Sequence, residues 1–278
     1  MSMNIDGYTK KYGILGNPVS HSLSPAMHNS AFSSLAMNSV YLPFEVDNLE
    51  GALAGVRTLG IEGLSVTIPH KQAVIPLLDT IDPVAQKIGA VNTIKVIRQG
   101  DGVVLHGLNT DWIGANRALE VKTTLTGKRA VILGAGGAAR AIGFGLKEAG
   151  SSIEICSRTE ESGRALASDL LCDWYPLSAR EHLSADILIN ATSVGMRPHD
   201  KESIIAEDLL GNFRVVMDIV YVPLMTKLLV DANESGCVTV NGLEMLLYQG
   251  VEQFEIWTGE KAPVEVMRNV LMKATNNK

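Results

Sequence analysis

The segment VILGAGGAAR carries a clear chemical signal, because Gly134, Gly136 and Ala139 form the spacing G-x-G-x-x-A. It follows an apolar, strand-like run and opens a helical one. In that context the first glycine allows a tight turn, the second lets the backbone approach a pyrophosphate, and the small third residue permits close helix–strand packing. A glycine-rich packing turn without a ligand is the weaker alternative. The pattern predicts a dinucleotide site, with the phosphates at the helix N-terminus.

The end of the next predicted strand indicates which dinucleotide is bound. An NAD site places Asp or Glu there to accept hydrogen bonds from the ribose hydroxyls. This chain has Ser157, Arg158 and Thr159 instead, with no acid at the tip. Arg158 can pair with a 2′-phosphate and Thr159 can donate to it, which favours NADP over NAD. The acids of EESG follow at once and offset part of the positive field, and a solvated surface charge is the alternative role for Arg158.

Two serines in GNPVSHSLSPAMHN are candidates for holding a small anion. Ser22 and Ser24 are two residues apart, so in an extended segment their hydroxyls face the same side. A helix is expected next, with Ser24 as its cap and Pro25 at its first position. Hydroxyls beside a helix N-terminus suit a carboxylate, although capping alone explains Ser24 equally well. His21 and His28 have no nearby Cys or acid to complete a ligand set, so no metal is expected.

Further polar residues stand where predicted strands and helices meet turns. In SVTIPHK, Ser65 and Thr67 share one face of a strand, and Lys71 falls near the start of the next helix, where the dipole mildly disfavours a cation. The others are Asn92 in GAVNT, Asp111 in GLNTD, Tyr221 at the end of the strand DIVY, and Gln249 in NGLEMLLYQG. Each has an ordinary alternative as an exposed lysine, a capping aspartate or a core residue. Their shared placement beside turns is what indicates a functional site.

Composition limits the classes of protein to which the chain can belong. With 278 residues, 46% hydrophobic and 19% charged, it should be folded and globular, as one large domain or two modest ones. A net charge of -6 argues against a broad nucleic-acid binder. The three cysteines, Cys156, Cys172 and Cys237, form no C-x-x-C pair, so neither a disulfide framework nor a zinc site is expected. Without a signal core or a membrane-length apolar run, we expect a soluble cytoplasmic protein.

Strand-like and helix-like segments alternate along the chain, which predicts an α/β fold with mostly parallel sheets. The first part contains strands in YGILG, VYLPFEV and GLSVTI, and a β-hairpin that turns at residues 99–102. Strands flank the glycine-rich turn and recur in ADILINATS, RVVMDIVY and GCVTV. After Gly242, apolar residues at helical spacing predict a helix that returns to the first part. We expect a substrate domain of residues 1–110 and 243–278, an inserted Rossmann-type NADP-binding domain of residues 111–242, and a site between the two.

Together these segments resemble shikimate dehydrogenases of the AroE type. The resemblance covers nearly the whole chain and rests on the ordered motifs GNPVSHSLSPAMHN, VTIPHK, GAVNT, GLNTD, GAGGAAR, SRT, NATSVGM, DIVY and NGLEMLLYQG. It implies reversible, NADPH-dependent reduction of 3-dehydroshikimate to shikimate, a step of chorismate and aromatic amino-acid synthesis. It also implies a small-molecule substrate, no nucleic-acid or membrane partner, and a monomer or homodimer.

The resemblance implies a role for each matching position. Lys71 and Asp111 would form the catalytic pair, in which Lys71 donates a proton to the developing alkoxide and Asp111 orients it. Substrate contacts would come from Ser22, Ser24, Thr67, Asn92, Asp111, Tyr221 and Gln249. Cofactor contacts would come from Gly134, Ala135, Gly136, Gly137, Ala138, Ser157, Arg158, Thr159, Ile219 and Gly242. The family often has Asn in place of Ser157 and Met in place of Ile219.

Three alternatives stay open at this point. The nearest is a quinate/shikimate dehydrogenase with broader substrate or NAD use, against which the SLS and SRT segments argue. A non-catalytic NADP-binding or regulatory protein of the same fold is the second, and the presence of both Lys71 and Asp111 counts against it. The third is another two-domain dehydrogenase, for example one acting on folates, which leaves the paired serines unexplained.

Overall fold

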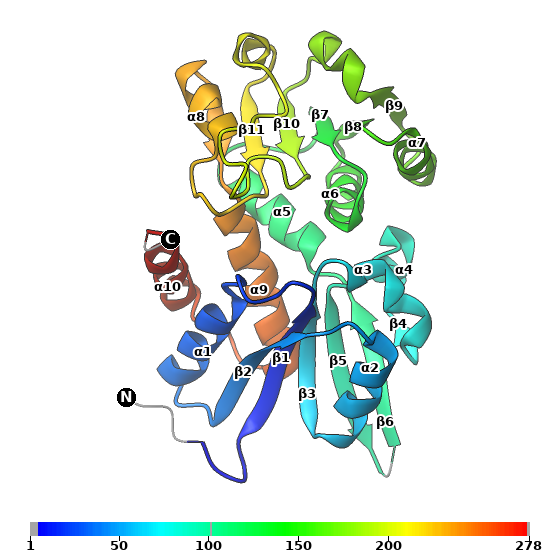
Figure 1. Ribbon diagram of the computed structural model, residues 1–278, viewed down its shortest axis with the longest axis vertical. Coiled ribbons are helices and arrows are strands. Elements are labelled where there is room, and N and C mark those ends of the chain that lie inside the picture. Colours follow the sequence, from blue (N-terminus) through cyan, green and yellow to red (C-terminus); the bar gives the residue numbers. More distant parts are fainter. Residues whose placement is uncertain (1–4, 101, 277–278) are drawn as a thin grey trace. The chain divides into compact units, whose positions relative to one another are not determined.

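The computed structural model describes residues 5–100 and 102–276, which divide into two compact units (Figure 1). The first consists of the chain up to Thr110 together with Gln249–Ala274, and the second is centred on Asp111–Tyr248. The change from the second unit back to the first falls inside one helix, α9 (Gly242–Thr258), and not at 242/243. Residues 1–4, 101 and 277–278, which the expected domain ranges and hairpin turn include, lie outside the described residues.

The first unit is built on a mixed six-stranded sheet with the order β2-β1-β3-β5-β6-β4. Its strands are β1 (Lys10–Gly16), β2 (Ser39–Glu45), β3 (Ile61–Val66), β4 (Thr80–Ile81), β5 (Thr93–Gln99) and β6 (Gly102–Leu108). Strand β1 is parallel to β2 and β3, whereas β5 is antiparallel to both β3 and β6. The predicted hairpin is therefore confirmed as β5–β6.

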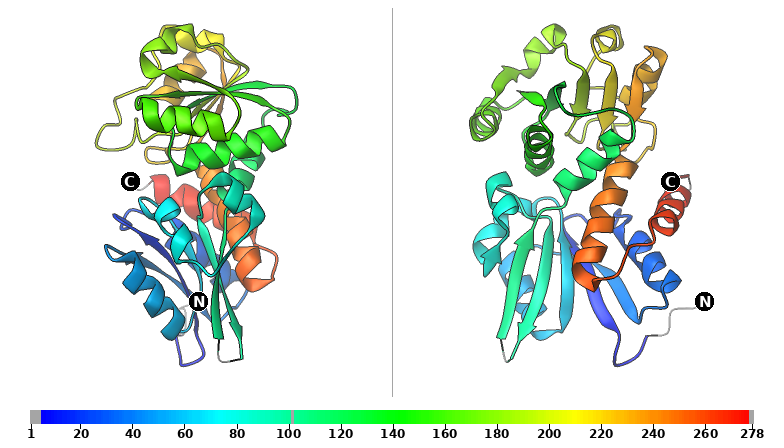
Figure 2. Two further views of the ribbon diagram at one scale, coloured as in Figure 1. Left: turned by 90° about the vertical axis from the view of Figure 1, so that its right-hand side faces the viewer. Right: turned by 180° about the vertical axis from the view of Figure 1, so that it is seen from behind.

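Helices cover both faces of this sheet (Figures 1 and 2). Helix α2 (Leu49–Thr58) packs on the face that carries Leu64 and Val66. On the other face, α1 (Ser24–Ser34) packs on β1 and β2, and the alternate residues of β3 face α9. There Gly63 leaves room for the indole of Trp257, which a Cβ would overlap, so α9 lies directly on the sheet. The unit also contains α3 (His70–Ala73), α4 (Pro83–Ile88), α10 (Val264–Asn276) and a 3-10 helix at Ile75–Leu77.

The second unit is built on an all-parallel sheet with the order β12-β11-β10-β7-β8-β9. Its strands are β7 (Arg129–Leu133), β8 (Ser152–Ser157), β9 (Asp173–Pro176), β10 (Ile187–Asn190), β11 (Val215–Asp218) and β12 (Val238–Val240). Its helices are α5 (Asp111–Glu120), α6 (Gly137–Glu148), α7 (Glu160–Asp169), α8 (Lys227–Glu234) and 3-10 helices at Leu177–His182 and Glu207–Asn212. The strand order runs outward from β7 in both directions, so the turn after β7 is the switch point where such sheets bind ligands.

Two further observations concern membrane and metal chemistry. Within the described residues, no helix combines the length and apolarity that a membrane crossing requires. The same residues contain no group of three or more His, Cys, Asp or Glu side chains that could hold a metal ion. The three cysteines are unpaired thiols, two of them buried.

Candidate active site

The glycine-rich turn lies at the carboxyl end of β7, and its glycines are needed for two different reasons. Gly134 has φ of +116°, and a Cβ there would approach the carbonyl oxygen of Ala191 to 3.1 Å. Gly136 is the exposed residue before α6, and a Cβ there would meet no protein atom within 4 Å. Protein packing therefore does not explain Gly136. The open space beside it fits a phosphate bound by the unpaired N–H groups of Gly137 and Ala138 in the first turn.

The tip of β8 carries the side chains predicted to select the cofactor. Arg158 and Thr159 are both exposed, so both can reach a ligand. Glu160, the first acid after them, forms an ion pair with Arg164, with 2.8 Å between Nε and Oε1. The acidic charge that follows Arg158 is thus partly neutralised within α7.

Ser157 has a different environment from its two neighbours. It is buried, its hydroxyl donates to the carbonyl oxygen of Thr159 at 3.0 Å, and it accepts from the indole nitrogen of Trp174 at 2.9 Å. These bonds hold the turn that presents Arg158. The geometry therefore favours Ser157 as a residue that shapes the turn, and it leaves direct contact with a cofactor to Arg158 and Thr159.

A buried carboxylate that sequence analysis did not single out closes the end of β11. Asp218 accepts hydrogen bonds from Asn190 Nδ2 (3.0 Å), Val220 N (3.0 Å) and Thr226 Oγ1 (2.7 Å). Burial raises the pKa of Asp218 to about 6, although the three hydrogen bonds act in the opposite direction. Since β11 ends at Asp218, the prediction that Tyr221 ends the strand is wrong. Tyr221 lies instead in the loop that Asp218 fixes, and an acid ending an apolar strand was the available signal.

Two residues predicted to lie near the nicotinamide are brought together in the second unit. A Cβ on Gly242 would overlap the carbonyl group of Ile219, so α9 can begin here only with glycine. The amide of Ile219 donates to the carbonyl oxygen of Asn190 at 3.1 Å, which fixes the start of the same loop. Tyr221 is half-buried, and burial raises the pKa of its hydroxyl.

The paired serines of the first unit do not lie in an extended segment. Helix α1 begins at Ser24, and the residue before it, Leu23, has helical angles (φ -91°, ψ -8°). No side chain caps the helix, so the prediction that Ser24 caps it is wrong. The N–H of Ser24 instead donates to Ser22 Oγ at 3.2 Å. Because Leu23 is already helical, the chain enters the helix earlier than the Ser-Pro pair suggested, and both hydroxyls remain near its N-terminus.

Lys71 lies in the first turn of α3, as the sequence predicted. Its backbone is fixed from two sides, because Val91 N donates to the Lys71 carbonyl oxygen at 2.8 Å and the neighbouring His70 Nε2 bonds to Val46 O at 2.8 Å. Thr67, half-buried, directly follows β3 and donates its N–H to Leu15 O at 2.9 Å. The segment VTIPHK is therefore anchored to the GAVNT segment and to the end of β2.

Asn92 is at the centre of a buried polar network in the first unit. Its Oδ1 accepts from Thr93 Oγ1 (2.7 Å) and Thr110 N (2.8 Å). Its Nδ2 donates to Thr110 Oγ1 (3.0 Å) and more weakly to Gln249 Oε1 (3.5 Å). Asn92 and Gln249, predicted to bind the same substrate, are thus brought together although 157 positions separate them. Thr110 directly precedes Asp111, the buried first residue of α5.

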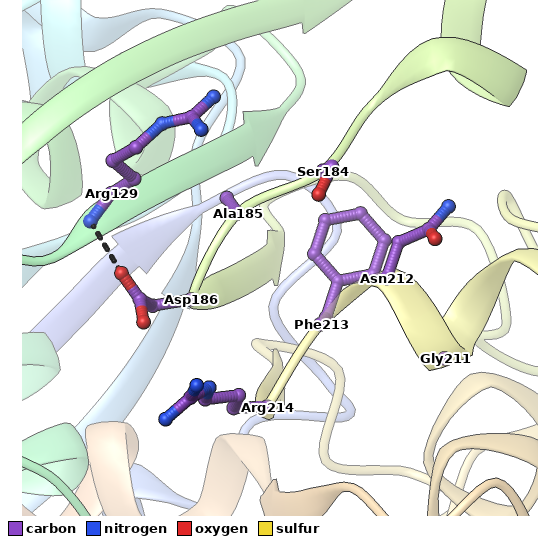
Figure 3. Close-up of a pocket in the computed structure, with 8 residues that line it drawn as sticks. All are labelled: Arg129, Ser184, Ala185, Asp186, Gly211, Asn212, Phe213 and Arg214. Carbon is purple, nitrogen blue, oxygen red and sulfur yellow. Dashed lines mark hydrogen bonds between the residues drawn. The ribbon is translucent and has the colours of Figure 1, made fainter.

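A shallow hollow of about 280 Å³ lies at the other end of the second sheet, before β7, β10 and β11 (Figure 3). Figure 3 shows the backbone nitrogen of Arg129 bonded to the carboxylate of Asp186, at 3.1 Å. Lys128 also pairs with Asp186, and the Arg129 guanidinium pairs with Glu154 at 3.1 Å. Parallel sheets bind ligands at the carboxyl ends of their strands, so this charge-paired hollow is not the candidate site.

Comparison with known proteins independently supports the resemblance to shikimate dehydrogenases. Residues 14–94 match the family description "Shikimate dehydrogenase substrate binding domain", and residues 242–272 match "Shikimate 5'-dehydrogenase C-terminal domain". The shikimate dehydrogenase (NADP(+)) of Methanothermobacter thermautotrophicus is 48% identical over 98% of this chain and 99% of its own length. That of Pyrococcus furiosus is 47% identical over 96% of this chain and 97% of its own.

Solved structures agree with the sequence relatives. A crystal structure of a shikimate dehydrogenase in complex with NADP+ superposes with a TM-score of 0.91 at 43% identity, covering 97% of both chains. The Thermus thermophilus enzyme in complex with NADP(H) and shikimate gives a TM-score of 0.86 at 36% identity, covering 95% of this chain and 99% of that one. The glycine-rich turn, the exposed arginine after β8 and the full-length similarity lead to one conclusion: this chain belongs to the shikimate dehydrogenase family.

Proposed function

We propose that the protein catalyses the reversible, NADPH-dependent reduction of 3-dehydroshikimate to shikimate in the biosynthesis of chorismate and the aromatic amino acids. The observation that carries this proposal is 48% identity to a shikimate dehydrogenase (NADP(+)) over 98% of the chain. Similarity over the whole length includes both the cofactor motif and the polar residues of the first unit. A relative that shared only the nucleotide-binding fold would support much less.

The second unit supplies the cofactor-binding residues in this proposal. The N–H groups at the start of α6 and the space beside Gly136 accommodate the pyrophosphate. Arg158 pairs with the 2′-phosphate. It is suited to this role because it is exposed and because the nearby Glu160 is already paired with Arg164. Ile219 and Gly242 form the wall for the nicotinamide.

The first unit supplies most of the substrate-binding residues. The hydroxyls of Ser22 and Ser24 hold the carboxylate beside the N-terminus of α1. Amides and hydroxyls suit the ring hydroxyls of the substrate, since each can donate or accept a hydrogen bond. These contacts come from Thr67, Asn92, Tyr221 and Gln249.

Proton transfer is assigned to Lys71 and Asp111. When bound, NADPH would supply the hydride that the carbonyl carbon of the substrate accepts. The oxygen then becomes negative, and Lys71 stabilises that charge and donates a proton to it. Asp111 orients the ammonium, and in the oxidation direction Lys71 takes the proton back. Because α3 is a single turn of four residues, its dipole is too weak to disfavour a cation, and the need for a cation beside the developing alkoxide is sufficient to explain the lysine.

The proposal also covers location and assembly. Three unpaired thiols fit a reducing compartment, so we propose that the enzyme works in the cytoplasm, as a monomer or a homodimer. Analytical ultracentrifugation of the purified protein would distinguish the two assemblies.

Initial rates with shikimate and quinate, each with NADP+ and NAD+, test the proposed function directly. We expect kcat/KM to be highest for shikimate with NADP+. Comparable rates with quinate or NAD+ would show a broader dehydrogenase instead. Binding of NADP+ without turnover of either substrate would contradict the proposal and favour a non-catalytic protein.

A further inference from the structure

Gln253, one turn of α9 after Gln249, joins three elements of the first unit through buried hydrogen bonds. Its Oε1 accepts from Ser65 Oγ on β3 at 2.8 Å. Its Nε2 donates to the Asn92 carbonyl oxygen at 3.1 Å and to Thr93 Oγ1 on β5 at 2.9 Å. Tyr41 on β2 extends this series of hydrogen bonds, since its hydroxyl donates to Ser65 Oγ at 2.6 Å. All five side chains are buried.

The donor and the acceptor of each hydrogen bond in this series can be assigned from one backbone carbonyl group. The oxygen of Asn92 can only accept, so the atom of Gln253 that faces it must be the NH2 group. The other end of that amide is then an acceptor, which makes the Ser65 hydroxyl its donor and the Tyr41 hydroxyl the donor to Ser65. On the second branch, Thr93 Oγ1 accepts from Gln253, and its own proton points to Asn92 Oδ1.

This direction determines what Asn92 offers to a ligand. Two donors, the Thr93 hydroxyl and the Thr110 N–H, hold its Oδ1, so the amide cannot turn over without losing both bonds. The side chain therefore presents its NH2 group toward Gln249. That contact is long, at 3.5 Å, and a substrate oxygen that accepts a shorter bond can replace it.

We propose that Gln253 and Thr93 are positioning residues which lock the Asn92 amide with its NH2 group toward the substrate, so that this subsite selects an oxygen acting as a hydrogen-bond acceptor. Neither residue touches the substrate; both act through Asn92. The inference rests on the proposed function for the identity of the substrate, but the orientation of Asn92 can be measured without turnover.

Two substitutions each remove hydrogen bonds that hold the Asn92 amide in place, at different positions in the series, and two further substitutions serve as controls. Thr93→Val removes the hydroxyl at nearly constant shape, and Thr93→Ser restores it. Gln253→Met removes the amide that bonds to the Asn92 backbone carbonyl and to Thr93, one step further from the Asn92 side chain. Trp257→Phe is the matched control, because its indole donates to the Ile94 carbonyl oxygen at 3.0 Å from the same helix to the same strand, without a link to Asn92.

We expect Thr93→Val and Gln253→Met each to raise the KM for shikimate about tenfold, the factor expected for one hydrogen bond. The kcat and the KM for NADP+ should stay near wild type, and Thr93→Ser should behave like wild type. Trp257→Phe should lower the melting temperature and leave the KM for shikimate unchanged. A purely structural role would instead give the same behaviour in all destabilised variants, and an unchanged KM in both Thr93→Val and Gln253→Met would overturn the proposal.

The side-chain NH2 signals of Asn92 in a 15N-labelled, ligand-free sample give a readout that needs no activity. In wild type and Trp257→Phe we expect two distinct, slowly exchanging signals. In Gln253→Met and Thr93→Val they should exchange faster with water, and if one variant does not fold, the other decides. Slow exchange in the folded variants would refute the lock even if shikimate is the substrate. Faster exchange of the Asn92 NH2 protons in the variants would support the proposed positioning role even if the wild-type protein failed to oxidise shikimate. That failure would contradict only the proposed function.

Discussion

The two units assemble their candidate sites in different ways. In the second unit, the proposed phosphate site is one continuous segment, VILGAGGAAR, whose proposed donors are backbone N–H groups. In the first unit, the Asn92 network includes hydrogen bonds between residues 157 to 188 positions apart, and apart from the Thr110 N–H its donors named above are side chains. The comparison teaches that backbone donors need only the correct local turn. Side-chain donors need partners from distant segments to fix their direction.

The largest effect should separate the chemistry of the first unit from the cofactor binding of the second. Lys71→Ala removes the proposed proton donor and should lower kcat at least ~100-fold, the low end for general acid–base catalysis. The KM for NADP+ should change little. Stopped-flow and steady-state rates would measure this, with the exposed Lys87→Ala as the control. Turnover near wild type would remove Lys71 from the mechanism.

A second test asks whether the turn in the second unit is shaped for a ligand or for the protein. Gly136→Val puts a side chain where no protein atom lies within 4 Å, so the melting temperature should hold while the KM for NADP+ rises roughly 10- to 100-fold, the value of one charge-assisted hydrogen bond. Gly134→Ala is the contrast, since its positive φ and its contact with Ala191 should make it lose stability. Equal loss of stability in both variants would contradict the distinction.

A third test concerns cofactor selection at the tip of β8. Arg158→Gln should lower the preference for NADP+ over NAD+, taken as the ratio of kcat/KM values, about tenfold, because an exposed ion pair with the 2′-phosphate is weakened by solvent. Arg129→Gln, at the other end of the sheet, should leave the ratio unchanged. An unaltered ratio in Arg158→Gln would indicate that another group recognises the phosphate.

The same contrast explains what the sequence could and could not predict. The glycine-rich turn and the β5–β6 hairpin are local patterns, and both were found where expected. The prediction that Ser24 caps the helix was wrong because the Ser-Pro pattern does not reveal that Leu23, the residue before it, already has helical angles. Gln253 was missed because one of several polar residues on an amphipathic helix acquires its role only from Ser65 and Thr93, which lie on strands far away in the sequence.

The units should also differ in how acid affects their stability. Burial in the first unit lowers the pKa of His28 to about 3, well below the ordinary value for histidine. Between that ordinary value and about 3, the unfolded chain holds the extra proton, so acidification should reduce the free energy of unfolding by up to about 1.4 kcal/mol per pH unit. His28→Phe, which keeps the ring stacked on Tyr41, should remove this slope in urea titrations at several pH values. A slope as steep as in wild type would contradict the assignment.

Asp218 in the second unit should act with the opposite sign. Its folded pKa of about 6 lies above the ordinary value of 3.8, so the folded state holds the extra proton between the two. Stability should therefore fall as pH rises through that window, again by up to about 1.4 kcal/mol per pH unit. Asp218→Asn should abolish this loss, and urea titrations of the variant between pH 4 and 7 would show whether it does.

The contact between Gln253 and Ser65 also has a consequence for the nascent chain during translation. The two residues are 188 positions apart, so at ribosomal speeds of 5–20 residues per second Ser65 is made roughly 10–40 s before its partner. During that interval the sheet surface around Tyr12, Tyr41 and Gly63 has no α9 to cover it. Strands β1, β2 and β3 are thus translated well before the helix that covers them, and we expect their exposed apolar surface to bind chaperones during that interval.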